Sequence, residues 1–335
     1  MVFESVIRFL GLHLCGRERL LRKLRDAIET EGLSFYPEAS GRTALYRLAL
    51  AWKNEGERNV AWVPDYICNV VDVAMERAGY EVRRYPTDEM LEPDMGVIRE
   101  ALASKAVDVL VTANVFGSSA LLDELKRDDT RTLILESGAR VVADLCQDIR
   151  LLAELPSGYG DRLAAVVSFN DKSFLGAMGG GIVASFDIPA PNRRATVAEA
   201  ATLYRALVAK VVKCLLRPGA HDTAGRRPFE FSHCVQFPYT FEVVAATRLQ
   251  LILAIIGMGN LEALGKRKRA FAQQCPGVRR TRFYQTSPYL VVDPVAENGQ
   301  PPERRCKGSY AMHGKPEDSR RPDLVVIHNK GFCDA

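Results

Sequence analysis

Residues Leu163–Gly181 read LAAVVSFNDKSFLGAMGGG, an apolar run that leads into a lysine and then a run of glycines. Nearly continuous apolar segments such as Leu163–Ser168 are typical of strands in a sheet that is covered on both faces. The glycines permit close approach of the backbone, and Gly181–Ser185 is predicted to be the next strand. The stretch therefore predicts an α/β protein with a central sheet flanked by helices.

Working outward from this stretch, helical patterns alternate with short β-branched runs from about residue 40, which is the signature of parallel βαβ units. Helices are predicted over Thr43–Lys53, Val70–Ala78, Pro93–Ser104 and Leu121–Lys126, and strands over Asn59–Val63, Glu81–Tyr85, Asp108–Thr112 and Arg140–Ala143. Thr130–Glu136 has the composition of a strand. We interpret it as a helix from a cap at Asp129 or Thr130 to Gly138, because the strand at 140–143 follows at once.

The composition divides the chain into four parts. These are an N-terminal helical segment (1–39), a large domain (40–216), a linker rich in proline, glycine and arginine (217–240), and a long helix with a small C-terminal domain (241–335). Long helices are predicted over Val197–Leu216 and Phe241–Gln274, the second broken near Gly257. From about residue 294 the tail is predicted to be irregular, with Leu324–Ile327 as its only strand. The C-terminal part is therefore predicted to be a smaller, atypical α+β unit.

Composition excludes several classes of protein. The 335 residues are 47% hydrophobic and 26% charged, as in soluble globular proteins, and the net charge of +4 is too small to indicate nucleic acid binding. Five scattered histidines show no metal-ligand spacing, and eight scattered cysteines without a C-x-x-C pair indicate reduced, cytoplasmic thiols. Phe9–Leu14 is short, is interrupted by His13 and is not followed by a cleavage pattern, so it is interpreted as a helix of the fold and not as a signal peptide. Leu249–Met258 is about half a membrane span and is interpreted as a buried helix.

Two segments carry candidate binding residues. Ser40-Gly41-Arg42 leads directly into a helix, so it is either an anion site or an ordinary N-cap with a turn glycine. Asp144 closes a buried strand, at the edge where open α/β sheets bind their ligands. A carboxylate there needs a cationic partner, which is either a structural arginine or a ring nitrogen of a cofactor.

Lys172 is the third candidate. It leaves a buried strand between aromatic residues, where loss of water contact would lower its pKa towards that of a nucleophilic amine. The alternative is a lysine on the rim of a loop, directed to water.

Together the three segments resemble the DegT/StrS family of sugar aminotransferases that use pyridoxal 5'-phosphate (PLP), in both order and spacing. The resemblance covers about Ser40–Ser185 and includes the glycine–helix motif at Ser40–Leu45, the element Asp144-Leu145-Cys146-Gln147, and the element from Ser168 through Lys172 to Gly181. It implies the fold-type-I PLP-transferase architecture, with residues 40–216 as the PLP-binding domain.

The resemblance also implies residue roles. Lys172 would bind the PLP aldehyde and move protons, and Asp144 would keep the ring nitrogen protonated. Gly41, Arg42 and Ser168 would hold the phosphate, and Gln147 would contact a ring substituent. The family often has an aromatic residue at the position of Cys68, and Tyr66 is a nearby substitute for ring contact.

The implied reaction moves an amino group, from glutamate as the expected donor, to a keto-sugar nucleotide for polysaccharide or secondary-metabolite synthesis, in a homodimer. The alternative is a degenerate, non-catalytic family member that binds PLP or serves as a scaffold or partner protein. A PLP dehydratase is disfavoured because Lys172 is present. A Rossmann nucleotide-binding protein is disfavoured because no G-x-G-x-x-G follows the first strand.

Overall fold

The structure is a computed structural model of the chain. It describes residues 2–28, 32–55, 59–88, 92–113, 120–169, 179–189, 191, 193–205, 243–263, 265–266, 289–292, 309–312 and 324–328.

Helices and strands alternate through the first half of the chain, as predicted. The helices are α1 (Val2–His13), α2 (Arg17–Ile28), α3 (Gly41–Trp52), α4 (Asn69–Ala78), α5 (Met95–Ala103), α6 (Ala120–Leu125), α7 (Asp128–Ser137) and α9 (Arg248–Met258), with short 3-10 turns at Ile149–Glu154 and Gly160–Arg162. The strands of the main sheet are β1 (Ser34–Glu38), β2 (Val60–Pro64), β3 (Glu81–Tyr85), β4 (Val109–Ala113), β5 (Arg140–Asp144), β6 (Leu163–Ser168), β7 (Gly180–Ala184), β8 (Arg193–Arg194) and β9 (Val244–Ala245).

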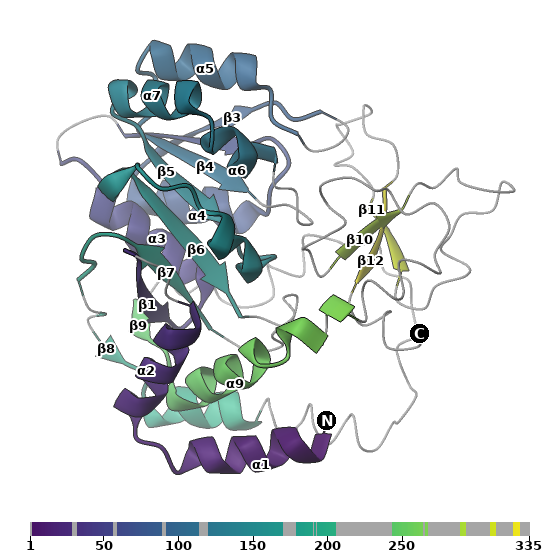
Figure 1. Ribbon diagram of the computed structural model, residues 1–335. Coiled ribbons are helices and arrows are strands. Elements are labelled where there is room, and N and C mark those ends of the chain that lie inside the picture. The colour runs from purple at the N-terminus through teal and green to yellow at the C-terminus, as the bar shows by residue number, and fades with distance from the viewer. Residues whose placement is uncertain are drawn as a thin grey trace, which may run out of the picture.

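The main sheet has the strand order β3-β2-β4-β5-β6-β7-β1-β9-β8 (Figure 1). Strands β3, β2, β4, β5 and β6 are mutually parallel, and β7 runs antiparallel to both β6 and β1. The carboxyl ends of β2, β4, β5 and β6 therefore meet at one edge of the sheet, which is where ligands bind in open α/β folds.

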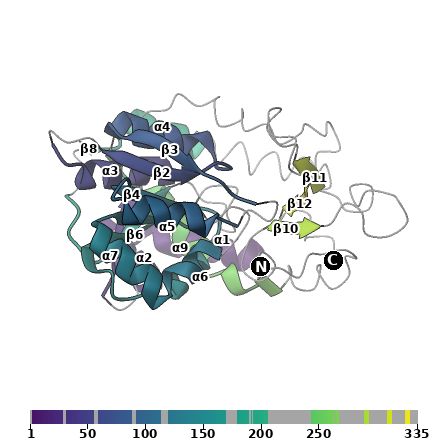
Figure 2. The same cartoon turned by 90° about the horizontal axis from the view of Figure 1, so that it is seen from above.

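Helices cover both faces of this sheet, and the alternation of strand side chains explains why. In β5, Val142 packs against α3 and α4, whereas Val141 and Ala143 pack against the layer that contains α2, α5, α6 and α7. Figure 2 shows α3 and α4 on one side of the strands and α5 to α7 on the other. Since both faces are buried at the centre of the sheet, the central strands β4, β5 and β6 read as nearly continuous apolar runs rather than alternating ones.

Strand β1 corrects the prediction that residues 1–39 are only helical. Ser34–Glu38 contains a proline and an acidic residue, which both disfavour a strand. The fold accommodates them because β1 pairs with β9 only at Glu38, so Pro37 has a strand partner only in β7, and because the buried Glu38 forms an ion pair with Arg47 of α3. Burial lowers the pKa of Arg47 to about 10.

The start of α9 also differs from the prediction of a helix from Phe241. Val244–Ala245 forms the short strand β9, and the helix begins at Arg248. Thr247 and Gln250 form a capping box in which each side chain accepts a hydrogen bond from the backbone N–H of the other. The helix ends at Met258, in agreement with the break predicted near Gly257.

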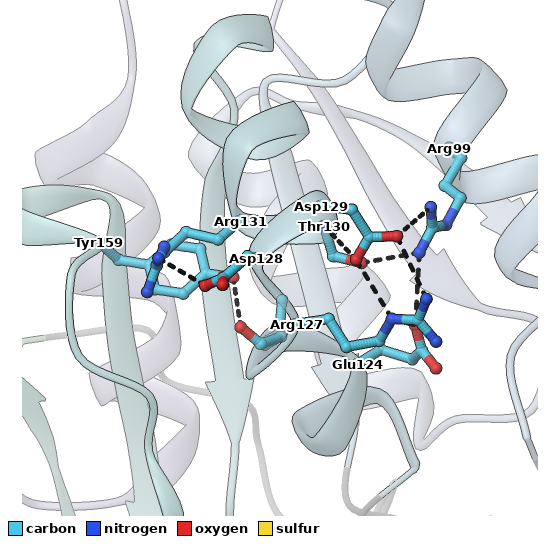
Figure 3. A network of polar contacts seen from close by, with 9 residues as sticks. Arg99, Glu124, Arg127, Asp128, Asp129, Thr130, Arg131 and Tyr159 are labelled. Carbon is cyan, nitrogen blue, oxygen red and sulfur yellow. Dashed lines mark hydrogen bonds and ion pairs between the residues drawn. The ribbon is translucent and has the colours of Figure 1, made fainter.

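Helix α7 confirms the helical interpretation of 130–136 and its end at Gly138, which adopts a positive φ of 83°. The predicted cap is wrong, because the helix begins at Asp128. Asp129 instead joins a surface network across α5, α6 and α7 (Figure 3). Its carboxylate accepts hydrogen bonds from Arg127 and Arg99, which lower the pKa of Asp129.

The C-terminal tail corrects the prediction of a single strand after residue 294. Strands β10 (Tyr289–Val292), β11 (Ser309–Met312) and β12 (Leu324–His328) form an antiparallel sheet in the order β10-β12-β11, apart from the main sheet (Figure 1). Leu324–Ile327 is therefore part of a central strand, not an edge strand. Tyr289–Val292 reads YLVV, which is typical of a strand, and it was not predicted as one; Ser309–Met312 reads SYAM, which has no such pattern.

Of the predicted helix over Val197–Leu216, residues 197–205 are helical, and Tyr204 Oη lies 3.1 Å from His13 Nε2 at the end of α1. The predicted linker at 217–240 lies outside the described residues. Among the helices that are described, none has the length and apolar character needed to cross a bilayer.

Candidate functional site

Helix α3 starts at the carboxyl edge of the parallel strands, directly after β1. Ser40 is its N-cap, as one of the two sequence interpretations proposed: Ser40 Oγ accepts a hydrogen bond from Thr43 N–H at 3.1 Å, and Thr43 Oγ1 accepts one from Ser40 N–H at 3.2 Å. The amides of Gly41 and Arg42, in the first turn, have no carbonyl acceptor within the helix. The cap therefore coexists with a helix end suited to an anion.

Gly41 is where the three sequence segments meet. A Cβ atom built on Gly41 would lie 3.0 Å from Ser168 Cβ, 3.1 Å from Cys146 Sγ and 3.3 Å from Val167 O. The first turn of α3 is thus in contact with the end of β6 and with the residues that follow β5. Only a residue without a side chain fits this position without displacing its neighbours.

Gly180 of β7 also allows the start of α3 to pack closely against the end of β6. A Cβ at Gly180 would overlap the backbone nitrogen of Gly41 and lie 2.8 Å from Gly41 Cα and 2.5 Å from Val167 O. All of these atoms belong to the backbone, so rotation of a side chain cannot relieve the overlap.

We therefore expect Gly180→Ala to destabilise the protein by about 1–3 kcal/mol, the usual cost of overpacking, and to weaken anion binding at the start of α3. Gly11→Ala is the matched control, because nothing lies within 4 Å of its Cβ position in α1. It should be neutral or stabilising by up to about 1 kcal/mol. Urea unfolding of both variants measures the difference, and equal stabilities would contradict the role given to Gly180.

Asp144 is the last residue of β5, between Ala113 of β4 and Val166 of β6. Its Oδ1 accepts a hydrogen bond from the Cys146 N–H at 3.0 Å. Burial raises the pKa of the Asp144 carboxyl, and the hydrogen bonds from Cys146 oppose the rise. Within the described part of the chain Asp144 forms no ion pair, so the arginine partner of the structural interpretation is not found there. A cationic ligand group would offset the cost of its charge.

Cys146 connects Asp144 to Gly41. Burial raises the pKa of the Cys146 thiol well above its usual value, with smaller contributions from Asp144 and then Cys68. Cys68 precedes α4, and its Sγ donates to Asn69 Oδ1 at 3.8 Å. Cys68 therefore lies within electrostatic reach of the same cluster. Cys146 stays protonated and poorly reactive at neutral pH, so its role here is to pack.

The other predicted binding residues lie at the same edge of the sheet. Ser168 ends β6, is buried and pairs with Gly180. Gln147 follows Cys146 and is half-buried, and Tyr66 is buried in the connection between β2 and α4.

Lys172 lies outside the described residues. The chain on either side of it is described, and there Phe169 N–H donates a hydrogen bond to Gly179 O at 2.9 Å. The described residues on the two sides of this gap are therefore joined directly after Ser168 by one backbone hydrogen bond.

A cavity of about 520 Å³ lies elsewhere in the fold. Its walls include Leu163, at the amino end of β6, whereas Ser168 is at the carboxyl end. Five steps along a strand separate the two by roughly 17 Å. The cavity is therefore not part of the site around Asp144.

Two contributors were not recognised as site residues from the sequence. Gly180 was noted only as part of a glycine run, and the run was the available signal. Gln250 lies within the helix predicted over Phe241–Gln274 and was not singled out. Its signal was the pattern Thr247-x-x-Gln250, which is that of a capping box.

Comparison with known proteins gives structural likeness only. No protein-family model and no curated protein sequence matches the chain. DesV from S. venezuelae, solved in complex with a ketimine intermediate, superposes with a TM-score of 0.57 at 16% identity, over 97% of this chain and 88% of DesV. 3-Amino-5-hydroxybenzoic acid (AHBA) synthase gives 0.56 at 14% identity, over 98% and 90%. A DegT DnrJ EryC1 StrS aminotransferase from Brucella abortus gives 0.57 at 13% identity, over 97% and 90%.

These likenesses show the fold. The mostly parallel sheet flanked by helices, predicted from the sequence as the fold-type-I architecture, is confirmed.

Proposed function

We propose that this protein, which has the fold-type-I architecture, is a PLP-dependent aminotransferase that transfers an amino group from glutamate to a keto-sugar nucleotide. The observation that carries the proposal is the convergence of Gly41, Asp144 and Ser168 at one edge of the sheet. The similar structure from Brucella abortus, which is named an aminotransferase, supports the class of reaction.

The residues fit a phosphate at one end of the site. Gly41 brings the start of α3 against Ser168, leaving no room for a larger residue between them. In the proposal the Gly41 and Arg42 amides and the Ser168 hydroxyl donate hydrogen bonds to the phosphate oxygens. The positive end of the α3 dipole adds to their attraction.

The residues also fit a pyridine ring. Asp144 would hold a proton on the ring nitrogen, since that cation offsets the burial cost of the carboxylate. Gln147 would contact a ring substituent, and Tyr66 and Cys68 would contact the ring from the β2–α4 connection. When bound, PLP supplies an electron sink for the reacting amine carbon.

Lys172 completes the proposal. Its amine would bind the cofactor aldehyde covalently and then move a proton to and from the substrate carbon. The hydrogen-bonded pair Phe169 and Gly179 supports this role, because it starts the lysine segment directly after Ser168.

The setting proposed for the enzyme is the cytoplasm, where it acts as a homodimer in polysaccharide or secondary-metabolite synthesis. The scattered cysteines support a reducing compartment.

An absorption spectrum of the purified full chain with PLP tests the proposal. A band at about 420 nm is expected from PLP joined to a lysine, and it should decline on addition of glutamate. A stable band that glutamate does not change would favour the degenerate, non-catalytic alternative. A protein that takes up no PLP would overturn the cofactor itself.

A further inference from the structure

Gln250 joins α9 to the turn that precedes the anion-binding end of α3. The residue is buried, with 5% of its surface exposed. Its Oε1 accepts a hydrogen bond from Thr247 N–H at 2.7 Å, and its Nε2 donates one to Ala39 O at 2.9 Å. The first bond caps its own helix, whereas the second reaches a residue more than two hundred positions earlier in the chain.

Ala39 is held on both sides by the same short segment. Its N–H donates to Val244 O at 3.1 Å, and its carbonyl accepts from Gln250. Both backbone polar groups of Ala39 are thus bonded to the stretch from β9 to the first turn of α9. Ser40 and Gly41 follow at once, so the position of Ala39 sets where α3 begins.

The aliphatic part of Gln250 lies beside Gly179. A Cβ built on Gly179 would lie 3.5 Å from Gln250 Cβ and 3.4 Å from Glu38 O. Gly179 has a φ of +117°, a conformation that favours glycine, and its carbonyl closes the segment 170–178 through Phe169. Gln250 therefore bonds to the turn before Gly41 and lies close to the position that a side chain at Gly179 would occupy.

We infer that Gln250 is a positioning residue, which fixes the turn Ala39–Arg42 so that the amides at the start of α3 meet the anion at the correct distance. The inference rests on the proposed function for the identity of that anion, the phosphate of PLP. It places a determinant of cofactor affinity on α9, outside the span Ser40–Ser185. Binding groups need support from neighbours that hold them within about 0.5 Å of their productive position.

Two variants of the full-length chain separate this role from the capping of α9. Gln250→Met keeps the length of the side chain and removes both of its hydrogen bonds, the one to Ala39 O and the one from Thr247 N–H. Thr247→Ala removes one capping hydrogen bond from the same helix end and leaves the bond to Ala39 in place. Should Gln250→Met fail to fold, Gln250→Glu replaces it, since it keeps the acceptor for Thr247 N–H and loses the donor.

Two measurements are made on each variant. Hydrogen exchange of the peptide 39–45 in protein without cofactor reports the turn directly. Titration with PLP, followed by absorbance, gives the dissociation constant. Gln250→Met should speed exchange at 39–45 and weaken PLP binding about tenfold, the effect of losing roughly one hydrogen bond. Thr247→Ala should lower the melting temperature and leave both readouts within about twofold of wild type.

Unchanged exchange in Gln250→Met would overturn the inference, as would equal weakening of PLP binding in both variants. A third outcome separates the two proposals. If the wild-type protein binds no PLP and Gln250→Met still exchanges faster at 39–45, the proposed function is overturned, whereas the positioning of the turn by Gln250 is supported.

Discussion

Lys172→Ala is expected to leave a folded protein that attaches no PLP covalently and transaminates about 10²–10⁴-fold more slowly than wild type. That range is typical for removal of a positioned acid–base group. The reason is the position of Lys172 in the chain, four residues after Ser168 and ahead of the hydrogen bond that closes the segment at Gly179. Borohydride reduction of the wild-type protein with PLP, followed by peptide mapping, should place the label on Lys172.

Lys126→Ala is the matched control for this variant. Lys126 lies on the surface, where it pairs with Glu154 and Asp123. Its loss should change neither the label nor the rate, since exposed ion pairs contribute little to stability. A label on any other lysine, or a Lys172→Ala protein with wild-type activity, would refute the assignment.

Asp144→Asn is expected to lower the transamination rate by about 10²–10³-fold, the effect of removing one electrostatic stabiliser of a developing charge. The stability of the fold should not decrease. Because burial raises the pKa of Asp144 above its unfolded value, the native state binds the proton more tightly, and this contribution to stability is lost as pH rises through the folded pKa. The neutral amide removes that loss, so the free energy of unfolding at neutral pH should equal or exceed that of wild type.

Asp148→Asn, four residues further along the chain, is the control: it is expected to lower stability and to leave the rate nearly unchanged. Asp148 is buried, forms an ion pair with Arg150 at 3.0 Å and caps the following 3-10 turn. Its replacement should cost about 1–3 kcal/mol of stability with little effect on the rate at saturating cofactor. If Asp144→Asn instead loses stability and keeps its activity, Asp144 is a structural residue.

The sequence was sufficient to predict the strands and helices of those parts of the fold in which neighbouring strands of the sheet lie close together in the chain. Strands β2 to β6 and their helices follow from local periodicity, because each βαβ unit buries an apolar run between its own helices. The prediction failed where a segment depends on distant partners. Pro37 and Glu38 disfavour a strand at β1, which pairs with β7 and β9. The small C-terminal sheet depends on β12 pairing with β10 and β11, which lie apart from it in the chain.

For the site, the residue types made Gly41 and Asp144 candidates, the resemblance to a known family added Ser168, and the fold brings the three to one edge. Residue types and spacing could not reveal that Gly180 must lack a side chain, because that constraint comes from the backbone of Gly41 across the sheet. Gln250 was missed for a similar reason, since its partner Ala39 belongs to another part of the chain. The role of Lys172 stays a prediction.

Strand β1 has a consequence for synthesis on the ribosome. Its Phe35 pairs with Val183, about 150 residues later, and Glu38 with Ala245. At 5–20 residues per second, β1 waits roughly 7–30 s for β7 and longer for β9. During that time it is an unpaired strand with an aromatic side chain, which other nascent chains or chaperones can bind. Proline and charged residues hinder the association of exposed strands, so Pro37 and Glu38, which are poor strand formers in the finished protein, protect the chain while it is still being made.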